Sequence, residues 1–104
     1  MRLHALLICA ALSLLLPAWA HALTPGQRVL VVHSYSPDNA WTGKIAAGIR
    51  EGLKGSGASI ESFYMDAKRR PAPEQLRQAA LQAMERIAAL NPQVVIAVDD
   101  AAQE

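Results

Sequence analysis

The chain has 104 residues, 52% of them hydrophobic, and its ten lysines and arginines against nine aspartates and glutamates give a net charge of +1. A nearly neutral chain without a basic patch is not typical of nucleic-acid-binding proteins, so we expect no nucleic-acid partner. The only cysteine, Cys9, excludes a disulfide framework and a thiolate metal site, and we expect no metal and no other cofactor.

Residues 1–22 have the pattern of a secretory signal peptide. Arg2 provides a positive start, residues 5–16 form an apolar run, and small residues follow up to Ala22. The run is shorter than the roughly 20 apolar residues that span a bilayer, although a retained membrane anchor is the alternative. We therefore predict cleavage after Ala22, a periplasmic mature chain that begins near Leu23, and membrane contact only during export.

A buried strand, a polar loop and an amphipathic helix are expected next. Residues 28–33 are apolar and β-branched, as in a parallel strand covered on both faces. Residues 34–39 favour a loop, in which Asp38 or Asn39 can cap a helix that begins at Ala40. Apolar residues then recur at every fourth position, which is a helical period. The residues of this stripe are Trp41, Ile45, Ile49 and Leu53.

Two glycines lie inside the predicted helix. Gly48 and Gly52 lower its helix propensity, and we interpret them as places where the helix approaches the sheet closely. The second predicted strand, residues 58–65, is more polar than the first, which suits an edge position. The charged residues 66–72 are interpreted as a solvated loop.

The second half of the predicted fold repeats the helix-strand alternation. Pro73 suits the first turn of a helix, and Asn91-Pro92 ends that helix. Residues 93–98 form a third strand that is apolar on both faces, and a further helix starts near Ala101. We expect an uncovered edge at this third strand and poor solubility as its consequence.

The alternation of strands and helices predicts the fold class. Parallel strands joined by right-handed crossovers give an α/β fold with three layers and a parallel sheet of strand order 2-1-3. In such sheets, ligands bind beyond the carboxyl ends of the strands where the strand order reverses, here between the first and third strands. Neither a Gly-x-Gly-x-x-Gly turn nor a P-loop follows the first strand, so an aromatic-walled pocket for a small organic solute fits better than a phosphate site. The candidate ligand-binding residues are Ser34, Tyr35, Ser36, Trp41, Asp99 and Asp100.

Each candidate residue has a structural alternative. Trp41 could cap the sheet as part of the core, and Ser34 and Ser36 could only hold the loop in place. His33 is expected to be satisfied by backbone groups at the end of the strand. Asp99 and Asp100 are neighbours in an extended chain and point to opposite sides, so at most one should face the crevice. Paired-carboxylate catalysis is therefore not expected, and we do not expect an enzyme.

Three short segments carry a family resemblance: His33-Ser34-Tyr35 after the first strand, Trp41-Thr42 in the helix, and Val98-Asp99-Asp100-Ala101 after the third strand. With the apolar residues around them, they resemble the start of ABC transporter substrate-binding proteins of the periplasmic binding protein type I fold. The resemblance is strongest to the branch whose members also serve as extracytoplasmic sensor domains of histidine kinases.

The resemblance implies a two-lobed receptor that closes on a small solute, with residues 23–104 as the first half of one lobe. The function it implies is periplasmic solute capture for an ABC-type uptake system, with an ABC permease as partner. The alternative is a ligand-sensing domain of a signal-transduction histidine kinase, with the sensor kinase as partner. A receiver-type phosphoacceptor is disfavoured, because His33-Ser34 stands where receivers carry an acidic pair.

Overall fold

The computed structural model of the chain describes residues 23–104, and the predicted signal peptide of residues 1–22 lies outside this part. Strands and helices alternate along the described residues. They are β1 (Arg28–His33), α2 (Ala40–Gly52), β2 (Ser59–Tyr64), α3 (Pro73–Leu90), β3 (Val94–Val98) and α4 (Asp100–Gln103).

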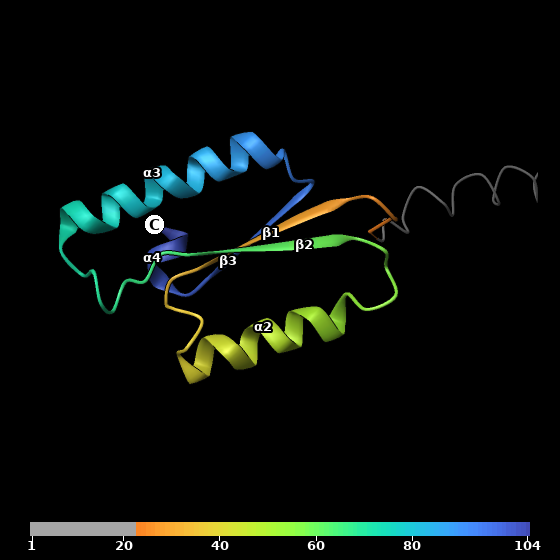
Figure 1. Cartoon of the computed structure of the whole chain (residues 1–104), viewed down its shortest axis with the longest axis horizontal. Helices are drawn as coiled ribbons and strands as arrows, with labels where there is room; N and C mark the ends of the chain where they lie inside the picture. Colours follow the sequence, from red (N-terminus) through yellow and green to blue (C-terminus); the bar gives the residue numbers. More distant parts are fainter. Residues whose placement is uncertain (1–22) are drawn as a thin grey trace, which may run out of the picture.

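The three strands form one parallel sheet of order β2-β1-β3, which confirms the predicted α/β fold and the strand order 2-1-3. Val31 at the centre of β1 pairs with Ser62 on one side and Ile96 on the other. Figure 1 shows α3 on one face of the sheet and α2 on the other, so the predicted three layers are present. The carboxyl ends of the strands, the start of α2 and α4 all lie at the same end of the sheet (Figure 1).

The hydrophobic core lies around β1, because this strand has a neighbour on both sides and a helix over each face. Residues alternate between the two faces of a strand, so Leu30 and Val32 point to one layer and Val29 and Val31 to the other. All four are buried, and burial of each such side chain contributes about 1.5–3 kcal/mol. On the α3 side, Leu30 and Val32 cluster with Met65, Ala79 and Ala83.

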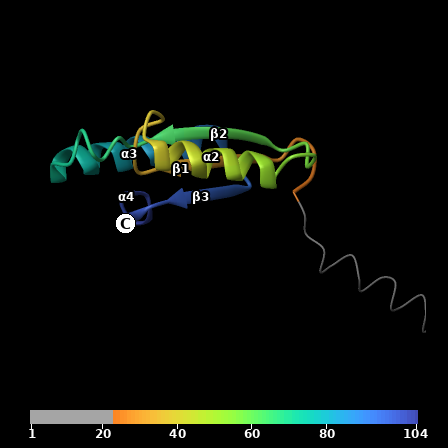
Figure 2. The same ribbon diagram turned by 90° about the horizontal axis from the view of Figure 1, so that it is seen from below.

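The two edge strands differ in their exposure. The edge position predicted for β2 is confirmed, and β3 forms the opposite edge. Figure 2 shows α2 in front of β1 and β2, with β3 to one side of it. The Val95 side chain is 43% exposed and Met84 on α3 is 65% exposed, so the predicted uncovered edge at β3 is confirmed.

Local signals account for the ends of the helices. The N-cap of α2 is Asn39, whose side chain accepts hydrogen bonds from the backbone N–H groups of Trp41 and Thr42. Helix α3 has Pro73 in its first turn, as predicted, and ends at Asn91 in the left-handed conformation. Among residues 23–104, no helix has both the length and the apolar character needed to cross a membrane.

The interpretation of the glycines in α2 is wrong. A Cβ atom built on Gly48 or Gly52 would meet no atom within 4 Å, so neither glycine marks a close approach of the helix to the sheet. Gly57, outside the helix, is the position where space is limiting. It has a φ of +73°, and a Cβ there would lie 3.0 Å from the Pro25 side chain.

Candidate functional site

The loops that follow β1 and β3 are joined by Ser34. Its backbone N–H donates to the carbonyl of Val98 at 3.1 Å, and its hydroxyl donates to the same carbonyl at 2.7 Å. The hydroxyl oxygen also accepts a hydrogen bond from the N–H of Ala102 at 3.0 Å. Because Ser34 is buried and its hydroxyl has two protein partners, the structure gives it the role of holding the two loops together.

A second contact at the same place involves two of the predicted ligand-binding side chains. The Trp41 indole Nε1–H donates to Asp99 Oδ2 at 3.1 Å, across 58 positions of sequence. Trp41 is 56% exposed, so the alternative in which it forms part of the core is wrong. The region where β1 and β3 end therefore presents one exposed aromatic side chain and one carboxylate.

The two neighbouring aspartates occupy different positions. Asp99 has a φ of +65° in the turn between β3 and α4, and its side chain makes no capping hydrogen bond with that helix. Asp100 is the first residue of α4 and is exposed. A positive φ in a residue other than glycine costs on the order of 1–3 kcal/mol, so the surrounding contacts hold Asp99 in this conformation.

Tyr35 and Ser36 lie in the loop after β1, next to the loop after β2. The Lys68 ammonium lies 4.9 Å from the centre of the Tyr35 ring, within the range of a cation–π contact. The Ser36 hydroxyl donates to Asp38, and Arg69 forms an ion pair with the same carboxylate. These groups line a hollow of about 230 Å³, with Asn39 and Asp66.

Charged groups in this hollow shift the pKa values of two side chains. The pKa of Asp38 is lowered by hydrogen bonds from Ser36 and Arg69, and the pKa of Arg69 is raised by Asp38. Sequence reasoning treated residues 66–72 only as a solvated loop and missed Asp66, Lys68 and Arg69. The signal was present, because these residues follow β2 and the carboxyl ends of parallel strands meet at one end of a sheet.

His33, like Ser34, is a deeply buried polar side chain at the end of β1. It is 1% exposed and stacks on Tyr64, with 4.9 Å between the ring centres and 11° between the planes. The expectation that backbone groups satisfy it is wrong, because neither ring nitrogen has a hydrogen-bond partner among the described residues. Burial lowers the pKa of His33, and the nearby Asp99 carboxylate opposes this shift only in part.

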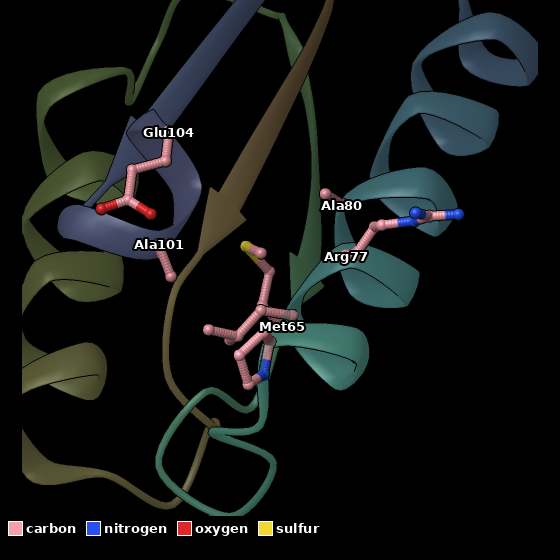
Figure 3. Close-up of a pocket in the computed structure, with 7 residues that line it drawn as sticks. Met65, Arg77, Ala80, Ala101 and Glu104 are labelled. Atoms are coloured by element: carbon pink, nitrogen blue, oxygen red, sulfur yellow. The ribbon is translucent and has the colours of Figure 1, made fainter.

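A second hollow, of about 440 Å³, lies between α3 and α4 and was not predicted (Figure 3). Met65 occupies its centre, with Ala101 on one side and Ala80 on the other (Figure 3). Arg77 and Glu104 provide its charged groups.

Residues 23–104 contain no cluster of three or more histidine, cysteine or acidic side chains arranged to hold a metal ion. Comparisons with models of known protein families, with curated proteins and with solved structures find no match for the chain. The resemblance to ABC transporter substrate-binding proteins therefore stays a prediction that depends on the residues quoted for it.

Proposed function

We propose that the chain binds a small organic solute in the periplasm and acts by capture rather than by catalysis. The observation that carries this proposal is the hydrogen bond between Trp41 and Asp99, which links the first turn of α2 to the turn after β3. This is the position at which open parallel sheets bind their ligands. An exposed indole offers a flat apolar surface, and the carboxylate beside it can accept from an amine or a hydroxyl group of the solute.

The solute-binding step is common to the two roles that the resemblance implies. In an uptake system the occupied protein would deliver its solute to an ABC permease, and in a sensor it would signal to a histidine kinase. We favour uptake as the role, with export by the N-terminal leader and cleavage after Ala22. We further propose that residues 23–104 correspond to the first half of one lobe of a type I periplasmic binding protein.

Trp41 also provides the measurement that tests the proposal, because after cleavage at Ala22 it is the only tryptophan left. The full chain should be exported, recovered from the periplasm and screened by indole fluorescence against amino acids, nucleobases and small amides. We expect at least one class to shift the emission saturably, since the solute replaces the contact between Trp41 and Asp99.

The binding site is then located by measuring the affinity of variants for that solute by calorimetric titration. Trp41→Ala and Tyr35→Ala should each weaken binding by about two- to tenfold, given ~0.5–1.5 kcal/mol for an aromatic contact beyond the area that it buries. Leu81→Ala is the matched control, because Leu81 is also exposed but lies on α3 away from the crevice. The proposal fails if no solute binds, or if all three variants keep the affinity of the wild type.

A further inference from the structure

A separate hollow lies on the opposite face of the sheet from the one in Figure 3, between α2 and strands β1 and β2. We call it the α2 hollow, and its volume is about 80 Å³. Its apolar lining residues are Val31, Ala46, Ile49 and Ile60, and its polar ones are His33, Arg50 and Ser62.

The strand register explains why these side chains meet. Val31 and His33 alternate onto the α2 face of β1, and Val31 pairs directly with Ser62 of β2. His33 therefore lies one step further along the same face. Arg50 reaches the hollow from the last turn of α2, so three elements each contribute one polar side chain.

His33 is the observation that points to a ligand. Both of its ring nitrogens are buried without a hydrogen-bond partner among residues 23–104, and His33 is one of the residues that line the hollow. A buried polar group without a partner costs about 1–3 kcal/mol, and folded proteins contain few of them. A neutral imidazole offers one N–H donor and one acceptor to a molecule in the hollow.

The charges around the hollow favour an anion. Arg50 forms no ion pair within the described part of the chain, so its guanidinium is available to a ligand. The other groups that face His33 are the Tyr64 ring, which stacks on it, and the Asp99 carboxylate after β3. Asp99 itself accepts the Trp41 indole N–H, which directs that carboxylate toward the crevice.

We propose that the α2 hollow binds a small monocarboxylate of the size of acetate, held by Arg50, Ser62 and His33. The guanidinium pairs with the carboxylate, the Ser62 hydroxyl and the His33 N–H donate to its oxygens, and the methyl group lies against Ile49 and Ile60. On this measure of volume one water molecule needs about 10–15 Å³, so the hollow has room for a ligand of a few heavy atoms. This site is distinct from the crevice of the proposed solute.

Sodium acetate is the probe for the test, with the exported full chain as the protein. Acetate should be titrated at constant ionic strength, made up with sodium chloride, while NMR follows the His33 ring and the Ser62 amide. We expect both signals to move saturably with acetate. Acetamide, which has the same shape without the charge, should bind about tenfold more weakly or not at all.

Two arginine variants separate this site from a general effect of anions. Arg50→Gln should weaken acetate binding about tenfold, since it removes a charge-assisted contact. Arg86→Gln, an exposed position on α3, should leave the affinity within about twofold. The proposal is overturned if chloride alone moves the His33 signals equally, if acetate causes no saturable change, or if Arg50→Gln binds acetate as tightly as the wild type.

Discussion

Two neighbouring polar residues, His33 and Ser34, are both buried at the end of β1 but differ in how they are satisfied. Ser34 uses its hydroxyl as donor to Val98 and as acceptor from Ala102. His33 makes no such bond among the described residues. The serine therefore stabilises the loops of the crevice, whereas the histidine is the group that remains available to a bound molecule.

The role of Ser34 predicts a loss of stability on mutation. Ser34→Ala should lower the free energy of unfolding by about 1–3 kcal/mol, because the Ala102 N–H and the two loops lose a buried partner. Urea denaturation measures this change. Ser59→Ala is the control, since Ser59 is an exposed serine on β2 and its replacement should stay within about 0.5 kcal/mol. If Ser34→Ala is as stable as the wild type, the hydroxyl does not hold the two loops together, and Ser34 stays a candidate ligand contact.

At the scale of elements, periodicity in the sequence was enough to predict the strands and helices. The apolar run of β1 and the period of four in α2 each correspond to an element in the structure, and the alternation predicts the strand order. Loop contacts could not be predicted in the same way. Whether Asp38 or Asn39 caps α2 depends on Arg69, which pairs with Asp38 and comes from a loop 31 positions away.

Within α2, Gly48 provides a test of the helix itself. Gly48→Ala should raise the free energy of unfolding by about 0.5–1 kcal/mol, because alanine has the higher helix propensity and its Cβ would meet no atom within 4 Å. Thermal unfolding followed by circular dichroism is a suitable measurement. Gly57→Ala should have the opposite sign, since its φ is +73° and Pro25 is 3.0 Å away. Destabilisation by Gly48→Ala would indicate that α2 packs more closely than the structure shows.

At the scale of the whole molecule, the two edges of the sheet have different chemistry. The β2 edge carries the exposed residues Ser59 and Glu61, which disfavour pairing with another strand. Strand β3 consists only of valine, isoleucine and alanine, and two of its five side chains are exposed. Met84 adds apolar surface beside it. Unprotected apolar edges of this kind favour association between chains.

The difference between the two edges predicts that the exported chain self-associates through β3. A single charge placed on β3 should reduce this association. Val95→Lys places an ammonium on an edge side chain that is 43% exposed, so it should lower the sedimentation coefficient at high protein concentration without unfolding the sheet. Ser59→Lys adds the same charge at the β2 edge and should leave the association of the wild type unchanged, because that edge is already polar. Equal effects of the two lysines would mean that net charge, rather than the β3 edge, controls association. If the wild-type chain stays monomeric over the whole concentration range, the prediction is wrong. The backbone groups of β3 would then have no tendency to pair with another chain.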